Sequence, residues 1–326
     1  MHTKPFLLKP SGKDYLWGGQ RINTEFEKNI NLSPLAETWE CSTHSDGPSY
    51  VSGGEYDGMT LAEVIKSNPE YLGSKFRGLN ELPILVKFID AQDNLSIQVH
   101  PDDEYARSHE NGQLGKSEMW YILDARENTR LVYGLNSTVD KETLRDSVES
   151  GDIEKYLQKV QVKQGDAFYI PAGTIHAIGK GAMIAEIQQS SNLTYRLYDY
   201  GRVDKTGRKR PLHVDKALDV ADLNGSIDPI RSMRVFNYSQ GAASELLCRC
   251  RYFEVYRLLV NTERKQRVKY QSDELGYRVL LCIKGCGNIR FANETLDIYK
   301  GDCLFVPSSS LEIRINGQFE FLDIRG

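Results

Sequence analysis

The sequence predicts a mainly β protein in which short strands build two barrel units, with a few helices inserted in the N-terminal part. Many short apolar segments, several with alternating polar residues, are separated by Gly, Asn or Asp. This pattern is typical of sandwiches and barrels. Only three stretches show helical spacing, and one strand-and-turn segment recurs near the C-terminus.

Nine segments have the length and composition expected of strands. They are ILVKFI at 84–89, LSIQVH at 95–100, EMWYIL at 118–123, DAFYIP at 166–171, MIAEIQ at 183–188, YFEVYRLLV at 252–260, YRVLLCI at 277–283, CLFVP at 303–307 and LEIRI at 311–315. Because they are spread along the chain, a β architecture is expected in both halves.

Helical signals occur in three places, all in the first half of the chain. Residues 61–72 have apolar side chains at helical spacing after Thr60, which can cap the first turn. Residues 137–148 begin with Ser-x-x-Asp, which resembles a capping box, and residues 152–160 repeat the apolar spacing after a glycine.

The chain contains an internal repeat. Residues 165–176 read GDAFYIPAGTIH and residues 301–312 read GDCLFVPSSSLE, at a constant offset of 136. This predicts two related units, at 1–235 and 236–326, with the turn-rich stretch 223–241 between them. A chance recurrence of a strand followed by a proline turn is the alternative.

Composition excludes several classes of protein. The 326 residues suffice for two domains, and 40% hydrophobic with 26% charged residues is ordinary for a soluble globular protein. A net charge of −4 argues against nucleic-acid binding. The N-terminal residues contain no long apolar run, so neither a secretory signal nor a membrane helix is expected. Six dispersed cysteines without a C-x-x-C pair indicate reduced thiols in a cytoplasmic protein.

Polar residues share one face of two predicted strands. Ser96, Gln98 and His100 are spaced i, i+2, i+4, while Lys116 and Glu118 repeat the spacing where the next strand starts. Polar groups on an inward face are costly unless they have partners, and a metal ion is one such partner.

A second histidine, His176, follows a tight Pro-Ala-Gly turn. Two imidazoles, a carboxylate and an amide would form a nitrogen and oxygen site that suits zinc and leaves one position open. Ligand type alone leaves iron and manganese open. His44 and His109 have no such polar neighbours and are expected to be ordinary surface or hydrogen-bonded residues.

The motifs resemble a known family. G-x5-P-x-G-x2-H, ending at His176, resembles the second cupin motif, and Gln98-Val-His100 resembles the first with Gln in place of its first His. LSIQVHPDDEYA, GKSEMWYIL, YIPAGTIHA and EIQQSSNLTYRLYDYGR, with DYLWGG and AETWECSTHSDGPS, together resemble type I mannose-6-phosphate isomerases in their short bacterial form, over roughly residues 4–215.

The resemblance implies two cupin-type (jelly-roll) β-barrels, the first catalytic and metal-binding. It implies an aldose–ketose isomerase that interconverts D-mannose 6-phosphate and D-fructose 6-phosphate through an enediol, with one Zn²⁺ per chain. The implied metal ligands are Gln98, His100, Glu118 and His176. A generic cupin would take its carboxylate from Glu104, but the isomerase pattern favours Glu118.

The second copy of the repeat is expected to be a metal-free structural barrel. Ser309 and Glu312 stand where the first copy has Gly173 and His176. No histidine follows His213 in the sequence.

The resemblance places Glu186 and Arg196 at the substrate, and Lys87, a charge within an apolar segment, is a candidate to face the phosphate. The expected catalytic residues are Arg196, Glu186 and Lys116, and the expected substrate-binding residues are Ser96, Lys87 and Gln98. Moving a proton between C1 and C2 requires a base, a group that stabilises the enediolate oxygens and a phosphate anchor. Glu186 suits proton transfer if burial raises its pKa. The identity of the base stays open.

Each of these roles has a plainer alternative. Arg196 would then pair with Asp199 at the surface, and Lys87 would occupy a solvent-facing strand position. Arg202 and the run GRKR at 207–210 are expected to form a solvated turn.

Two rival functions remain at this stage. One is another metal-dependent cupin enzyme, such as a dioxygenase, which would not need a phosphate-handling set. The other is a non-catalytic bicupin that binds sugar phosphate without turnover. The expected partner is a small sugar phosphate, without nucleic acid or membrane, and the chain is expected to be a monomer or homodimer.

Overall fold

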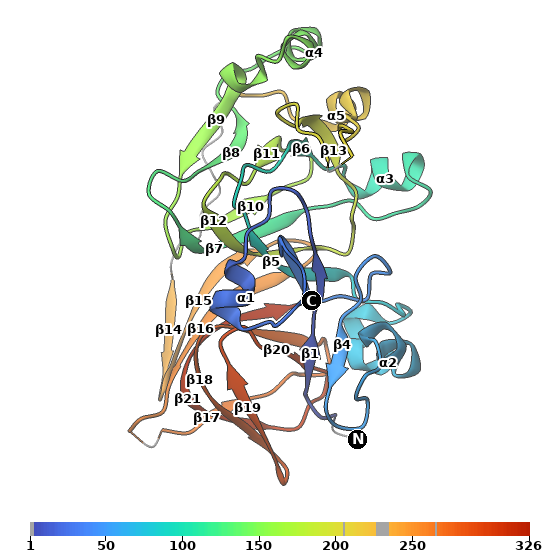
Figure 1. Cartoon of the computed structure of the whole chain (residues 1–326). Helices are drawn as coiled ribbons and strands as arrows, with labels where there is room; N and C mark the ends of the chain where they lie inside the picture. The colour runs from blue at the N-terminus through green and yellow to red at the C-terminus, as the bar shows by residue number, and fades with distance from the viewer. Residues whose placement is uncertain (1–2, 205, 226–234, 265) are drawn as a thin grey trace.

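The computed structural model describes residues 3–204, 206–225, 235–264 and 266–326. The protein is mainly β, as predicted, and its strands form antiparallel sheets of ten, six and five strands. Figure 1 shows the strands of the five-stranded sheet in the upper half, those of the ten-stranded sheet in the lower half, and the six-stranded sheet between them.

Each sheet follows an open strand order. The ten-stranded sheet contains β14 (Phe236–Ser239), β15 (Ala242–Arg249), β16 (Glu254–Asn261), β21 (Ile313–Arg325), β18 (Arg278–Phe291), β20 (Cys303–Val306), β1 (Phe6–Lys9) and β4 (Tyr50–Ser52), with β17 (Val268–Tyr270) beside β21 and β19 (Glu294–Tyr299) beside β18. The six-stranded sheet runs β10 (Ala167–Ile170), β7 (Glu118–Ala125), β12 (Ala182–Gln189), β5 (Ile84–Asp90), β3 (Glu37–Cys41) and β2 (Ser11–Lys13). The five-stranded sheet runs β13 (Tyr195–Tyr198), β6 (Ile97–Val99), β11 (His176–Ala177), β8 (Arg130–Leu135) and β9 (Leu157–Gln161). All nine predicted strand segments lie in or overlap these strands.

Short helices connect the strands. They are α1 (Arg21–Phe26), α2 (Leu61–Ser67), α3 (Asp103–His109), α4 (Lys141–Ser150) and α5 (Val214–Val220), with 3-10 turns at Pro69–Leu72, Ser74–Phe76 and Ile153–Tyr156. None of the helices in the described ranges is long and apolar enough to cross a membrane.

The predicted helix boundaries were partly wrong. Thr60 caps α2 with a full capping box, as expected, and the helix ends before Pro69. The cap of α4 is Asp140, which accepts the backbone N–H of Thr143, so the helix begins four residues later than predicted. The helix predicted at 152–160 is a single 3-10 turn followed by β9, in which the half-buried Gln158 and Val160 alternate with the exposed Lys159 and Gln161. A period of two residues is that of a strand, and pairing with β8 selects the strand over the helix.

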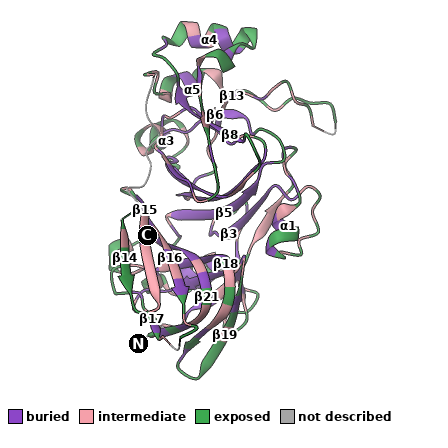
Figure 2. Ribbon diagram, turned by 90° about the vertical axis from the view of Figure 1, so that its left-hand side faces the viewer, coloured by how far each residue is buried: buried purple, intermediate pink, exposed green. Residues whose placement is uncertain are grey.

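The six-stranded sheet is covered on both faces. Every residue of β5 and β12 is buried, and Figure 2 shows β5 and β3 as a buried layer in the middle of the molecule. Val86 and Phe88 of β5 pack into the cluster shared with the ten-stranded sheet. Ile89 and Ile184 pack on the other face, in a cluster that reaches the five-stranded sheet. Lys87, in the middle of β5, is buried with its neighbours, which overturns the solvent-facing alternative for this residue.

The two ends of the chain meet in one sheet. β1 pairs with β20 and β4 pairs with β1, so N-terminal strands extend the sheet built by the C-terminal residues. Figure 1 shows β1 and β4, in blue, beside the orange and red strands. The division at residues 235 and 236 stays a prediction. Residues 226–234 of the predicted linker lie outside the described residues.

The internal repeat has a structural counterpart. β10 and β20 have the same bounds once the offset of 136 is applied. Gly173 has a φ of +88°, and Ser309, at the equivalent position, keeps a positive φ of +54°. A non-glycine residue in this region is uncommon, so both copies retain the same turn although only the first retains glycine and histidine.

A buried ion pair ties two sheets together. Lys28, after α1, lies 2.6 Å from the carboxylate of Glu40 on β3 and also donates to the carbonyl of Gly301, just before β20. Thr38 donates to the other carboxylate oxygen of Glu40 at 2.6 Å. Burial raises the pKa of Glu40, and Lys28 opposes that shift.

We expect Lys28→Met to destabilise the protein by about 3–5 kcal/mol, because it leaves the Glu40 charge buried without a partner. The double variant Lys28→Met with Glu40→Gln should recover most of the loss, since no unpaired charge remains. Urea unfolding of both variants measures the difference. A double variant as unstable as Lys28→Met would show that the lysine acts through packing instead.

Candidate metal centre and active site

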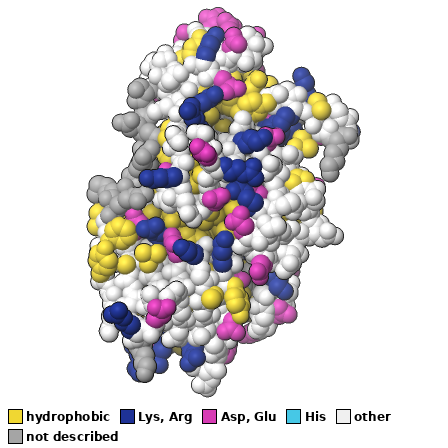
Figure 3. Space-filling view, turned by 60° about the vertical axis from the view of Figure 1, so that its left-hand side comes forward, with side chains coloured by type: hydrophobic (Ala, Val, Ile, Leu, Met, Phe, Trp, Pro, Cys, Tyr) yellow, Lys and Arg dark blue, Asp and Glu magenta, His cyan; other side chains and the backbone are white. Residues whose placement is uncertain are grey.

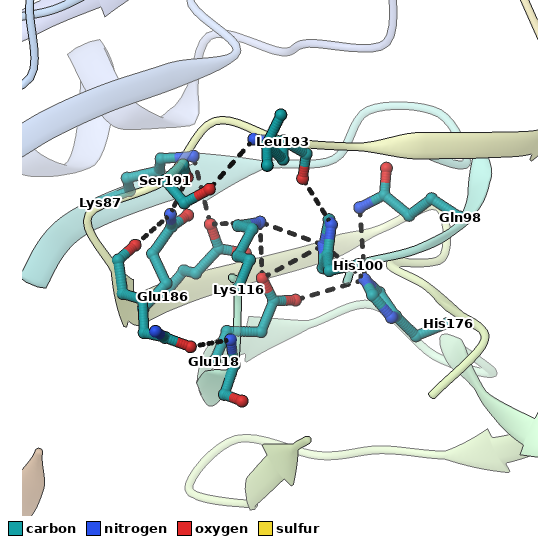
Figure 4. Close-up of polar contacts among 12 residues, drawn as sticks. Lys87, Gln98, His100, Lys116, Glu118, His176, Glu186, Ser191 and Leu193 are labelled. Carbon is teal, nitrogen blue, oxygen red and sulfur yellow. Dashed lines mark hydrogen bonds and ion pairs between the residues drawn. The ribbon is translucent and has the colours of Figure 1, made fainter. Parts of the chain in front are cut away.

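Three ligand-type side chains from different strands meet between two sheets. His100 follows β6 directly, His176 is the first residue of β11, and Glu118 is the first residue of β7. β6 and β11 belong to the five-stranded sheet, whereas β7 belongs to the six-stranded sheet. All three side chains are buried, and their candidate ligand atoms lie within 4.8 Å of one another. Figure 4 shows them pointing toward a common centre.

Backbone carbonyls set the tautomer of both histidines. The Nδ1 atom of His100 lies 2.8 Å from the carbonyl oxygen of Leu193, and the Nδ1 atom of His176 lies 2.8 Å from that of Thr174. A carbonyl can only accept, so each Nδ1 carries the proton. Burial lowers the pKa of His100 well below its ordinary value and that of His176 to about 4. Both rings are therefore neutral near pH 7.

The two Nε2 atoms therefore present lone pairs to the same point. They lie 3.1 Å apart, and they lie 3.5 and 3.4 Å from the carboxylate oxygens of Glu118. Lys116 Nζ lies 3.2 Å from the Nε2 atom of His100 and donates to it, and a metal ion at this point would bind both Nε2 lone pairs and the carboxylate together. This arrangement is the one in which protein-bound histidines present Nε2 to a metal, with Nδ1 fixed by a hydrogen bond.

Glu118 lacks the hydrogen bonds that normally accompany a buried carboxylate. Lys116 Nζ forms an ion pair with its Oε2 at 2.6 Å, and neither oxygen has a hydrogen-bond partner among the described residues. Burial, with the nearby Glu186, raises the pKa of Glu118 to about 7. A bound cation would add a second positive partner for this carboxylate, on the side of the histidines.

Gln98 and Ser96 border the cluster on β6 and just before it. The Gln98 amide nitrogen lies 3.3 Å from His176 Nε2, and its oxygen lies 3.4 Å from the Ser96 hydroxyl. A primary amide can present either atom in nearly the same place. The side chain is thus positioned to turn its oxygen toward a cation.

Buried charges of alternating sign continue away from the cluster. Lys87 lies 3.3 Å from Glu186 and 3.5 Å from Glu37, and Lys116 lies 3.9 Å from Glu186. Burial alone would lower the pKa of Lys87, but Glu37 and Glu186 raise it above its ordinary value. Burial alone would raise the pKa of Glu186, but Lys116 and Lys87 lower it. Glu186 is consequently ionised, and the condition attached to its predicted role, a raised pKa, is not met.

Two indoles hold these carboxylates in place. Trp120 Nε1 donates to Glu186 Oε2 at 3.0 Å, and Trp39 Nε1 donates to Glu37 at 2.9 Å. The Trp120 ring also packs edge-on against His176. Each carboxylate is thereby held in one orientation.

A cavity of about 240 Å³ adjoins the cluster. Its wall carries all six residues predicted for catalysis and substrate binding, which are Ser96, Gln98, Lys87, Lys116, Glu186 and Arg196. It also carries Tyr15, Trp17, Ile89, Leu95, Ile178, Glu37, Asn192, Thr194 and Arg210. The predicted site residues therefore share one place, with the histidine and Glu118 cluster beside it, while their individual roles stay predictions.

Arg196 does not pair with Asp199 as the plainer alternative had it. Asp199 is bonded instead by Arg202 and Arg210, the latter at 2.6 and 2.8 Å. Arg196 donates to the carbonyl oxygen of Pro211 at 3.0 Å. Glu104, the other candidate carboxylate, lies exposed on α3, away from the metal cluster.

Sequence reasoning missed Glu37 and Arg210 as cavity residues. Glu37 is the second residue of AETWE. It lies two residues before Trp39, so both side chains are on the same face of β3, and this spacing was the signal available in the sequence. Arg210 ends a charged run that was expected to be a solvated turn, and no local pattern distinguishes it from Arg208.

Comparison with known proteins assigns the chain to a family. The model of the phosphomannose isomerase type I catalytic domain matches residues 6–132, and that of the mannose-6-phosphate isomerase cupin domain matches residues 244–325. The mannose-6-phosphate isomerase ManA of Bacillus subtilis (strain 168) is 37% identical over 98% of each chain. The chain belongs to the type I phosphomannose isomerase family.

Solved structures of the family agree with this assignment. The crystal structure of a mannose 6-phosphate isomerase from Bacillus subtilis matches with a TM-score of 0.89 and 34% identity, over 99% of this chain and all of that one. A mannose 6-phosphate isomerase described as bound with zinc and yttrium matches with a TM-score of 0.77 and 16% identity, covering 99% of each chain. The second match bears on the fold alone.

We expect His100→Ala and His176→Ala each to lose the bound metal, because each removes one of only three close ligands. Metal analysis should give about one ion per chain for the unaltered protein and near zero for both variants. His109→Ala is the matched control, since His109 lies exposed on α3. Full occupancy in a double variant that lacks both cluster histidines would refute the assignment.

Proposed function

We propose that this protein is a mannose-6-phosphate isomerase that interconverts D-mannose 6-phosphate and D-fructose 6-phosphate at a single zinc ion. The observation that carries the proposal is the buried His100, Glu118 and His176 cluster, which opens on a cavity lined by charged groups. The similarity to a mannose-6-phosphate isomerase over 98% of the chain supports the same reaction.

The donor set fits zinc. Two neutral imidazole Nε2 atoms and one carboxylate form the set found in many catalytic zinc sites, which retain an open position for substrate. Gln98 would complete the ligands. A bound zinc ion supplies Lewis-acid stabilisation of a carbonyl oxygen, which is worth several kcal/mol in a transition state.

The residues around the cavity can divide the remaining work. Glu186 is held ionised between two lysines, so it is ready to accept a proton at its carboxylate. Lys116, close to both Glu186 and Glu118, can donate to oxygens on which negative charge develops. Arg196 supplies a second, permanently charged donor for those oxygens. Ser96, Gln98 and Lys87 would contact the substrate.

The proposal includes the architecture around the site. We take residues 1–235 as a catalytic cupin-type barrel with inserted helices and residues 236–326 as a second, metal-free cupin-type barrel. Glu312, at the position equivalent to His176, is exposed, and its carboxylate forms an ion pair with Lys269 at 2.8 Å. We expect a monomer or homodimer in the cytoplasm.

The charged cavity favours this function over its rivals. A dioxygenase needs open metal positions for oxygen but no set of lysine and arginine donors beside them. On the face drawn in Figure 3, basic side chains are interspersed with acidic ones, so that face offers no broad basic surface for nucleic acid. A binding protein without turnover would keep the cavity, and only kinetics separates it from an enzyme.

A coupled assay that detects fructose 6-phosphate formed from mannose 6-phosphate tests the proposal directly. We expect turnover that is lost after treatment with a chelator and restored by Zn²⁺, because the ion supplies the Lewis acid of the reaction. Oxygen uptake, measured in parallel, should be absent. Binding of mannose 6-phosphate without turnover in the zinc-loaded protein would favour the non-catalytic alternative.

Arg196→Lys should lower kcat by about 10²-fold or more, by analogy with the loss of one transition-state donor. Lysine keeps the charge but lacks the planar fork of donors. The variant should stay folded and zinc-loaded. Steady-state kinetics with mannose 6-phosphate measures the effect, and a raised KM with near-normal kcat would place Arg196 at the phosphate instead.

A further inference from the structure

The lysines of the cavity are already neutralised. Lys87 lies between the carboxylates of Glu37 and Glu186, and Lys116 lies 2.6 Å from Glu118. A phosphate placed beside either lysine would compete with a buried carboxylate for the charge of that lysine. A phosphate dianion therefore needs another partner in the same cavity.

Two arginines of the cavity wall belong to segments that lie against each other. Arg196 is on β13, and its guanidinium donates to the carbonyl oxygen of Pro211, the residue after Arg210. The backbone N–H of His213 donates to the carbonyl of Arg196 at 2.8 Å. These contacts bring Arg196 and Arg210 together, and the charge of Arg210 contributes to the lowered pKa of Arg196, after burial.

Arg210 is held rigidly but keeps free donors. Its Nε and NH2 groups bond to the two oxygens of Asp199 at 2.8 and 2.6 Å, in a two-point contact. Its NH1 group has no hydrogen-bond partner within the described ranges. A guanidinium fixed in this way loses little further conformational freedom when it binds a ligand.

Positive charge exceeds negative charge here. Asp199 is one carboxylate shared by Arg202 and Arg210. No carboxylate of the described residues lies within ion-pair distance of Arg196, whose buried Nε atom lacks a hydrogen-bond partner among them. Arg196 and Arg210 line the cavity, and together with Arg202 they outnumber the one carboxylate of Asp199, so this side of the cavity is positively charged and suits an anion.

We propose that Arg210, oriented by Asp199, anchors the phosphate group of the substrate in this cavity. The inference rests on the proposed function for the identity of the substrate. The NH1 side of Arg210, which Asp199 leaves open, can donate to phosphate oxygens, and Thr194 and Asn192 on the same wall add neutral polar groups. Arg196 remains beside the reacting carbons. In this proposal Arg196 acts in the chemical step, and Arg210 binds the phosphate.

A turn in the chain explains why Arg210 reaches the cavity while its neighbours do not. Asp204 accepts the backbone N–H groups of Thr206 and Arg208 at 2.7 and 3.0 Å and so closes a tight turn. Val203 and Lys209 then face each other across an isolated bridge. The segment after this bridge carries Arg210 back beside Asp199, whereas Arg208 stays exposed.

Arg210→Gln tests the anchor, with Arg208→Gln as its matched control in the same turn. We expect Arg210→Gln to raise both KM for mannose 6-phosphate and the inhibition constant of inorganic phosphate by about 10- to 100-fold, the loss of a charge-assisted hydrogen bond. The kcat value should stay within about threefold, because an anchor binds ground and transition states equally. Arg208→Gln should leave all three within about twofold.

Further measurements and a second variant make the result decisive. Zinc content and melting temperature establish that Arg210→Gln is folded, and Arg210→Lys, which keeps the charge without the fork, should fall between it and the unaltered protein. An unchanged KM and phosphate inhibition constant, or a loss confined to kcat, would overturn the inference. If the unaltered protein has no isomerase activity, the proposed function fails, and calorimetric binding of mannose 6-phosphate and of inorganic phosphate to the same variants still decides the role of Arg210.

Discussion

The rest of the site depends on one buried carboxylate, that of Glu118. It is completely inaccessible to solvent and receives no hydrogen bond within the part of the chain that is described. Such a group is stable only beside positive charge. Its neighbours meet that demand in two ways: Lys116 lies against one oxygen, and two neutral histidines direct their lone pairs to the same point, where a cation can bind. The surrounding charges then alternate, because each buried lysine requires its own carboxylate.

The middle sheet makes this concentration of charge possible. Along β5, apolar side chains face the ten-stranded sheet, and Lys87 points to the other side, toward the cavity. Successive side chains of a strand point to opposite faces of its sheet. One face of β5 therefore packs against the ten-stranded sheet while the other face lines the cavity. Because N-terminal strands also complete the C-terminal sheet, the support behind the site includes both ends of the chain. Displacing either end would therefore disturb the packing under the face that lines the cavity.

The candidate histidine and carboxylate ligands could be predicted from the sequence because they lie on or directly beside strands with regular spacing. Gln98 lies on β6, His100 follows that strand directly, and Glu118 starts β7. The family resemblance was needed to choose Glu118 over Glu104, since spacing along the chain allows both. The structure separates them for a simple reason: residues after His100 turn into α3, which carries Glu104 to the surface. The 3-10 turn and strand at 153–161 were predicted as a helix because short apolar patterns fit both periods.

The sequence by itself determined the mainly β architecture, the repeat and the set of residues that can ligate a metal, because these follow from local spacing and side-chain chemistry. Only the tertiary structure decided which partner each charge has. Lys87 and Glu186 pair across neighbouring strands, and Arg210 returns to Asp199 through a turn rather than staying in solvent. Charge pairing depends on distances between segments that are remote along the chain, and burial multiplies its strength. Neither quantity is encoded in the spacing of residues along one strand.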